Sequence, residues 1–362
     1  MNKAKELLKS TPNRRSFLKK GVAAGAAVAG AGLLSSALSE ASTQKGSGPT
    51  DGDIAILRFL AAAEIIETDL WVQYTELGGV TNGAQNNYQL ALQNLDGDGS
   101  QYITSNTIDE HTHANFLNAY LQSKGAQPVN LNKFRTLPGS QATGARPVKR
   151  ITNLMQLTVD TSFYVRYRSK QNPDFGAHFP QAFDIVGVPA IPRNDNDFGP
   201  ADHIQAIADT AAFHFAFIEQ GGSSLYHTMA LKVSDLEVLR IVLSIGADET
   251  HHFGEWMDFA GNACAAPLAP LTDPTNGLTF PDLNQVQHPV NLQTNLIFPI
   301  PCEFISPDLP LCAVIRPTNT QAVAAGAVQA FTDDGLFIGQ SQELFDTLSQ
   351  LAEAADAAAR GK

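Results

Sequence analysis

The segments Glu110-His111-Thr112-His113 and Glu249-Thr250-His251-His252 are the most informative part of this chain. Both follow the pattern Glu-x-x-His, although they lie far apart in the sequence. On an α-helix, residues three positions apart share one face, so each copy directs a carboxylate and an imidazole toward one point. His111 and His251 are turned by about 100° from these residues, and we expect them on the polar face or beside the site.

The two copies belong to a set of four long segments with helical periodicity. These segments are residues 53–77, 104–124, 201–230 and 234–261. The fourth begins with Ser234-x-x-Glu237, a capping box. A long connection, residues 126–200, separates the second segment from the third. Four helices with one long crossover predict an all-α four-helix bundle, which starts at residue 53 and ends at 261.

Each of the other two helices carries one carboxylate among apolar residues. Glu64 stands within Ala61–Ile66, and Glu219 follows Phe215 by four positions. A carboxylate on an apolar stripe is unfavourable unless it is paired or binds metal. Glu67 lies one turn after Glu64 on nearly the same face. Because the neighbours of Glu64 are more apolar, we choose Glu64 and expect Glu67 beside the site or facing solvent.

Together these side chains predict a dinuclear metal site. The candidate ligands are Glu64, Glu110, His113, Glu219, Glu249 and His252. One Glu from each of two helices and a Glu-x-x-His pair from each of the other two is the ligand set of ferritin-like di-iron and di-manganese bundles. Four carboxylates neutralise two divalent ions, and mixed oxygen and nitrogen ligands suit two Fe or two Mn ions. The alternative is that Thr107-x-x-Glu110 is an ordinary capping box at the start of a helix, and that both Glu-x-x-His pairs lie on the protein surface without binding metal.

Three further polar residues lie on the third helix. Tyr226 follows Glu219 by seven positions and is our candidate catalytic side chain, as a hydrogen-bond partner of a ligand or as a redox-active phenol. The alternative for Tyr226 is a packed core tyrosine. His214 and His227 have no matched partner, and we interpret both as structural.

At these positions the chain resembles the ferritin-like superfamily. The motif on the second helix of that family is matched by Asp109, Glu110, His113, Phe116 and Leu117. The motif on its third helix is matched by residues 219–226, and the motif on its fourth helix by residues 248–252. The chain is most similar to exported ferritin-like domains related to desiccation-related proteins of plants and bacteria. The resemblance covers residues 53–125 and 201–260. The insertion 126–200 and the tail after 262 depart from the minimal domain, so an oligomer is possible but no ferritin cage is expected.

The N-terminus predicts export. Asn13-Arg14-Arg15-Ser16-Phe17-Leu18-Lys19 resembles the twin-arginine consensus, an Ala/Gly-rich apolar stretch follows, and Ser39-Glu40-Ala41 offers small residues for cleavage. We therefore expect residues 1–41 to be a signal peptide read by the twin-arginine machinery and residues 42–52 to be a linker. The mature protein would be periplasmic or secreted, without stable membrane insertion. The alternative is an N-terminal membrane anchor.

The remaining segments are less regular. Residues 151–168 suit a helix or a strand, residues 172–200 read as a loop, and residues 262–362 form a Pro-rich extension. In that extension we expect a short strand at 311–316 and helices at 321–331 and 342–359. The chain has three cysteines, so at most one intrachain disulfide can form. Cys302–Cys312 closes the shortest loop, and free thiols are the alternative.

Charge narrows the possible partners. The net charge of the chain is −12, and that of the first 41 residues is +5. The remaining residues therefore have a net charge of −17. So acidic a protein repels nucleic acid, and we expect no nucleic-acid partner.

The first functional hypothesis is a di-metal oxidoreductase of peroxidase, catalase or oxidase type, which acts on O2 or peroxide in stress protection. The second is a non-enzymatic exported stress or desiccation-related scaffold with a structural or vestigial metal site. Iron storage is a weaker third.

Overall fold

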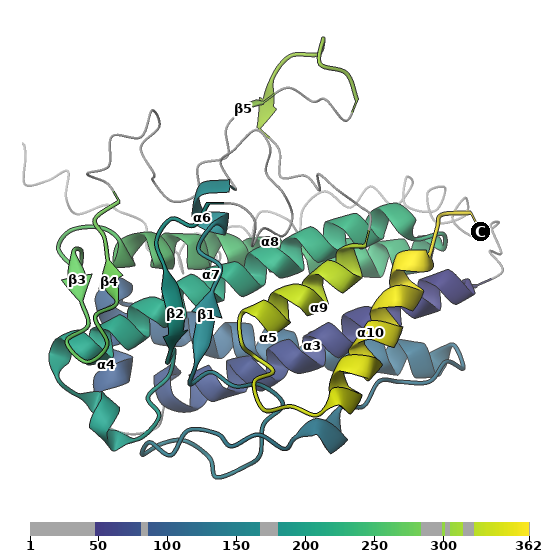
Figure 1. Ribbon diagram of the computed structural model, residues 1–362. Helices are drawn as coiled ribbons and strands as arrows, with labels where there is room; N and C mark the ends of the chain where they lie inside the picture. The colour runs from purple at the N-terminus through teal and green to yellow at the C-terminus, as the bar shows by residue number, and fades with distance from the viewer. Residues whose placement is uncertain are drawn as a thin grey trace, which may run out of the picture. The chain divides into compact units, whose positions relative to one another are not determined.

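The computed structural model describes residues 48–80, 86–166, 180–283, 299–300, 305–313 and 322–361 (Figure 1). Residues 49–362 form one compact unit. The expected signal peptide lies outside the described residues. Among the helices that are described, none combines the length and the apolar character needed to cross a bilayer.

Four long helices form the bundle. They are α3 (Asp51–Gly78), α5 (Gly99–Ser123), α7 (Ala201–Lys232) and α8 (Leu236–Ala263). Helix α3 packs on α5, α7 packs on α8, and α5 also contacts α8 (Figure 1). The short helix α4 (Asn87–Leu95) connects α3 to α5 and packs against α7. The prediction of an all-α bundle with four long helices is confirmed.

Two helices begin earlier than the sequence predicted. Thr50 caps α3 in a capping box with Asp53, so α3 starts two residues before residue 53. Helix α5 starts at Gly99, five residues before the expected position. Thr107 therefore lies inside α5, where its hydroxyl donates to the carbonyl oxygen of Ile103 at 2.7 Å. The alternative in which Thr107 caps a helix and leaves Glu110 solvated is wrong.

The start of α8 also differs from the prediction. Asp235, not Ser234, is the N-cap residue. Its carboxylate accepts the backbone N–H groups of Glu237 at 2.8 Å and Val238 at 3.0 Å. A carboxylate at this position satisfies two free donors and complements the positive end of the helix dipole.

The crossover contains more structure than a loop. It includes η2 (Asn132–Phe134), β1 (Leu157–Val159), α6 (Phe163–Arg166), β2 (Ile185–Val188) and η3 (Asp195–Phe198). Strands β1 and β2 pair antiparallel and lie against α7. Residues 151–168 therefore contain both a short strand and a short helix. The prediction that residues 172–200 form a loop is wrong for the residues of β2 and η3. Strand β2 forms because it pairs with β1. Residues 172–179 lie outside the described part.

Asp69 of α3 ties the crossover to the bundle. Its Oδ2 atom accepts the backbone N–H groups of Ile151 and Thr152 and the hydroxyl of Thr152, each at 2.9 Å. Arg135 donates to the other carboxylate oxygen. Asp69 is buried, so one carboxylate satisfies several donors that would otherwise be unpaired inside the protein.

The C-terminal extension covers the bundle with two helices. Helix α9 (Val323–Asp333) packs on α7, and α10 (Gln342–Ala357) packs on α3 and α9. Two small antiparallel hairpins precede them, β3 (Leu271–Thr272) with β4 (Thr279–Phe280), and β5 (Pro299–Ile300) with β6 (Cys312–Ala313). Strand β6 covers part of the expected strand at 311–316, and residues 314–316 lie outside the described part.

The expected Cys302–Cys312 disulfide is not supported. The thiol of Cys312 is free, and so is the buried thiol of Cys264. The register of the hairpin pairs Ile300 with Cys312, so the residue opposite Cys312 is not a cysteine. Cys302 itself lies outside the described residues.

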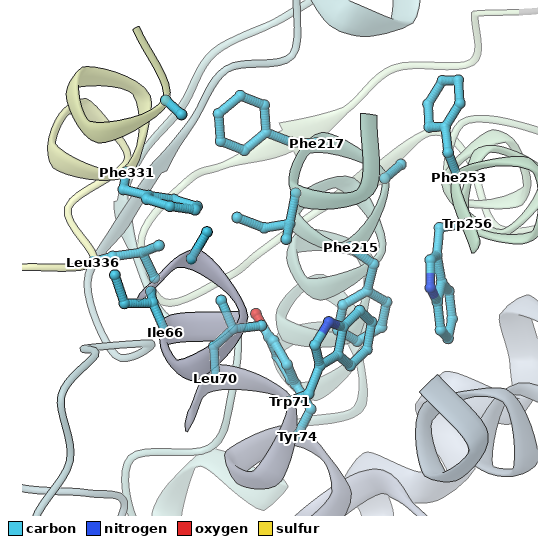
Figure 2. Packing of buried hydrophobic residues seen from close by; sticks show 14 of the residues in the cluster. Ile66, Leu70, Trp71, Tyr74, Phe215, Phe217, Phe253, Trp256, Phe331 and Leu336 are labelled. Carbon is cyan, nitrogen blue, oxygen red and sulfur yellow. The ribbon is translucent and has the colours of Figure 1, made fainter. Parts of the chain in front are cut away.

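An aromatic cluster fills the bundle core near its centre. Trp71, Tyr74, Phe215 and Trp256 come from α3, α7 and α8 and lie face to face or edge to face (Figure 2). Trp71 stacks on Phe215 and on Trp256, with ring centroids 4.8 and 5.2 Å apart. Such large buried rings contribute much of the apolar burial that holds the helices together.

Candidate metal centre

All six candidate ligands converge inside the bundle. They form two groups of four, and in each group the ligand atoms lie within 4.8 Å of one another. One group is Glu64, Glu110, His113 and Glu249, and the other is Glu110, Glu219, Glu249 and His252. Each long helix supplies at least one of these side chains. Glu110 and Glu249 belong to both groups, so their carboxylates stand between two neighbouring positions.

Each of the six side chains presents one unsatisfied polar atom. These buried atoms have no hydrogen-bond partner among the described residues: Glu64 Oε2, Glu110 Oε2, His113 Nδ1, Glu219 Oε2, Glu249 Oε1 and His252 Nδ1. Buried polar atoms normally have a partner, so six orphaned atoms in one cluster require an explanation. The cluster is compatible with a metal site, because four carboxylate oxygens and two imidazole nitrogens fit two divalent cations.

Aspartates from the opposite helix hold the two histidines. The Nε2 atom of His113 lies 3.1 Å from Asp248 Oδ2, and that of His252 lies 3.4 Å from Asp109 Oδ2. A proton on Nε2 then leaves Nδ1 free to face the cluster. Neither aspartate is among the ligands predicted from the sequence. The signal is nevertheless present there, because each Glu-x-x-His is preceded by Asp and the repeated pattern is Asp-Glu-x-x-His.

Two further side chains orient the carboxylates. Asn106, which the sequence analysis missed, donates to Glu110 Oε1 at 2.8 Å and to Glu219 Oε1 at 3.1 Å, and accepts from Trp256 at 2.6 Å. It lies one turn before Glu110 on the same face of α5. The buried phenol of Tyr226 donates to Glu64 Oε1. Tyr226 is therefore a hydrogen-bond partner of a candidate ligand.

Glu67 does not face solvent. Its residue is only 5 % exposed, and it lines a cavity of about 20 Å³ together with Gly222 and Phe331. The solvent-facing alternative is wrong because α9, whose packing the sequence did not reveal, covers this side of the site. His111 and His251 are exposed, as expected for the polar face. His227 contacts the carbonyl oxygen of Ser223 at 2.6 Å.

The cluster carries more negative charge than a buried site tolerates. Burial and the neighbouring carboxylate of Glu110 raise the pKa of Glu64 to about 8, and the same two causes raise the pKa of Glu249 and Glu219. Burial also opposes ionisation of Glu110, but the imidazoles of His113 and His252, whose Nδ1 atoms lie 3.6 and 3.2 Å from its carboxylate, outweigh it and lower the Glu110 pKa to about 2. Without cations, the carboxylates therefore retain protons that metal ions would displace.

This arrangement predicts that the metal-free protein loses stability as pH rises. The pKa of Glu64 is 4.5 in a free side chain and about 8 in the folded protein. Between these values the folded state holds a proton that the unfolded state has released, so raising the pH lowers the free energy of unfolding. Bound cations would replace that proton. Calorimetry at about pH 5 and about pH 8 should show a larger Tm difference between metal-loaded and metal-free protein at the higher pH; an equal difference would contradict the prediction.

The comparison with known proteins agrees with this geometry. The model of the ferritin-like domain family matches residues 52–262, which include all four long helices and all six candidate ligands. No curated protein and no solved structure matches the chain. A match over more than half of the sequence, with the bundle and the buried Glu/His cluster in place, shows that this chain belongs to the ferritin-like domain family.

Proposed function

We propose that this protein uses a dinuclear Fe or Mn centre for redox chemistry on O2 or peroxide. The observation that supports the proposal most strongly is the set of six orphaned buried atoms, one from each candidate ligand. Glu64 and His113 would hold one ion and Glu219 and His252 the other. Glu110 and Glu249, which belong to both groups, would be shared between them.

The surroundings of the centre favour a small substrate. The cavity beside Glu67 and Gly222 has a volume of about 20 Å³, which is room for about one water-sized molecule. The four candidate carboxylates are enclosed, since Glu64, Glu110, Glu219 and Glu249 are at most 1 % exposed. O2 and peroxide suit a space of this size, whereas a larger organic molecule does not.

The protein's own groups would position and protonate the substrate. When two redox-active metal ions are bound at these neighbouring positions, they would exchange electrons with O2 or peroxide. Asp109 and Asp248 fix the imidazole rings, and Asn106 fixes two carboxylates. Burial raises the pKa of Tyr226 well above its usual value, so the phenol keeps its proton beside Glu64. Because its hydroxyl donates directly to a candidate ligand, Tyr226 is our candidate for delivering a proton.

Metal analysis of protein isolated from its native export route tests the proposal. We expect about two Fe or Mn per chain and consumption of peroxide or O2 by the loaded protein. The Tyr226→Phe variant should retain the metal and lose most of the activity, which separates catalysis from metal binding. Folded protein with less than about one metal per chain would overturn the proposal and favour the non-enzymatic scaffold.

We also propose that the chain is exported by the twin-arginine route and acts in stress protection outside the cytoplasm. The arginine pair at Arg14-Arg15 and the small residues at Ser39-Glu40-Ala41 support export. A route that carries folded proteins suits a buried metal cluster, because the ions can be inserted before export. Recovery of uncleaved protein in the cytoplasmic fraction alone would contradict this proposal.

A further inference from the structure

A buried phenol, imidazole and carboxylate form a chain of contacts away from the metal centre. The hydroxyl of Tyr74 lies 2.7 Å from Nδ1 of His214, and Nε2 of His214 lies 2.8 Å from Oδ2 of Asp334. None of the three residues is more than 1 % exposed. The Nε2–Oδ2 contact is within ion-pair distance but is not a hydrogen bond. In the His214 tautomer that carries its proton on Nε2, Nδ1 accepts the phenolic proton. The sequence had suggested only a structural role for His214.

The aromatic cluster connects this phenol to the candidate centre. The ring of Tyr74 lies 5.8 Å from that of Trp71, which stacks on Trp256 at 5.2 Å (Figure 2). The indole N–H of Trp256 donates to Asn106, and Asn106 donates to Glu110 and Glu219. An unbroken series of contacts therefore leads from two candidate ligands to Tyr74.

We propose that Tyr74 is a redox-active side chain that loses an electron along the Trp71–Trp256 stack and a proton to His214. Oxidation of a phenol breaks its O–H bond, so a base at hydrogen-bond distance makes the step possible inside the protein. The electron reduces the oxidised stack, the proton binds Nδ1 of His214, and the carboxylate of Asp334 stabilises the resulting imidazolium. In the working protein a metal pair held by the six candidate ligands would supply the oxidising equivalent, so this role rests on the proposed function.

Two observations support this direction of transfer. Burial raises the pKa of Tyr74 well above its usual value, so the phenol stays protonated until it is oxidised. Asp334 also lines a cavity of about 460 Å³ between the β1–β2 hairpin and α9, which gives the proton a route out of the core. The relay thus provides a second redox position, separate from the ligands, at which an oxidising equivalent can be held.

Flash photolysis of the metal-free protein tests the relay. The chain has two tryptophans, and both stand in this stack, so photoionisation of tryptophan with an added electron scavenger oxidises the stack directly. We expect the tryptophanyl radical to decay as a tyrosyl radical forms, and the transfer to be slower in D2O because a proton moves. In Tyr74→Phe the tyrosyl yield should fall at least about tenfold, and in His214→Gln its formation should slow by about the same factor.

Two matched variants serve as controls. Tyr88 is also fully buried, but its hydroxyl donates to the carbonyl oxygen of Ala190 at 2.7 Å, and within the described residues it is hydrogen-bonded to no imidazole or carboxylate. Tyr102 lies 6.4 Å from Trp256 and is the competing acceptor. Tyr88→Phe and Tyr102→Phe should leave the tyrosyl yield unchanged. A yield that persists in Tyr74→Phe, or a wild-type transfer without an isotope effect, would overturn the proposal. Because no metal is needed, this result is independent of whether the centre binds Fe or Mn.

Discussion

The Glu249→Gln variant should lose both metal ions, not one. Its carboxylate belongs to both groups of four candidate ligands, so the substitution removes a negative charge and a strong ligand from each position at once. The neutral amide is a weaker ligand for Fe or Mn. We expect metal content to fall from about two ions per chain to below one, with an affinity loss of at least about 100-fold. Metal analysis of the purified variant measures this.

Glu64→Gln is the matched control for that experiment. Glu64 is as deeply buried as Glu249 and comes from another helix, but it belongs to one group only. It should therefore retain about one ion per chain. Glutamine keeps the size of the side chain, and far-UV circular dichroism should show intact helices in both variants. If both variants retained the same number of ions, the assignment of Glu249 as a shared ligand would be wrong.

The metal-free forms of these variants provide a second comparison. Gly222 lies so close to Glu249 that a Cβ atom there would overlap its carboxylate. The Glu249 side chain thus has little freedom to move, and an isosteric amide is the least disruptive change available. Burial raises the Glu249 pKa well above its usual value and so favours the neutral carboxyl group in the metal-free protein, and Glu249→Gln should therefore change metal-free stability little.

The candidate ligands could be predicted because they follow local rules. Glu110 and His113, like Glu249 and His252, are three residues apart on a long helix, and helical geometry alone places them on one face. Glu64 and Glu219 were identifiable because a carboxylate among apolar neighbours needs a compensating partner. These signals depend on neighbouring residues of one helix and require no knowledge of how the helices pack.

The features that were missed depend on long-range contacts. Glu67 is buried because α9, which comes more than 250 residues later, covers that side of the bundle. Strand β2 exists because it pairs with β1, and its four residues are too short a pattern to identify it from the sequence. Tyr74, His214 and Asp334 come from α3, α7 and the end of α9, so their contact could not be seen in the sequence. Asp109 and Asp248 are an exception, since their repeated position before each Glu was a visible pattern.

Asp69→Ala should be among the most destabilising substitutions in the described part of the chain. The carboxylate accepts two backbone N–H groups and one hydroxyl from residues 151 and 152 and pairs with Arg135. Its removal leaves those buried donors unsatisfied, at about 1–3 kcal/mol each before relaxation. Allowing for partial rearrangement, we expect a loss of about 3–5 kcal/mol in the free energy of unfolding, measured by urea denaturation.

The Arg135→Ala variant removes the ion pair of Asp69 but keeps its contacts with residues 151 and 152, so it measures the contribution of the ion pair to stability. The Arg135 side chain is 35 % exposed, so water can replace part of its interaction, and its loss leaves the three donors from residues 151 and 152 in place. The expected loss is therefore only about 1 kcal/mol. If Arg135→Ala destabilised the protein as much as Asp69→Ala, the ion pair would hold the crossover on α3. A much larger effect of Asp69→Ala would instead show that the crossover is fixed by the two backbone N–H groups and the Thr152 hydroxyl. Any residue except proline can supply the two N–H groups, whereas the hydroxyl needs the side chain of Thr152.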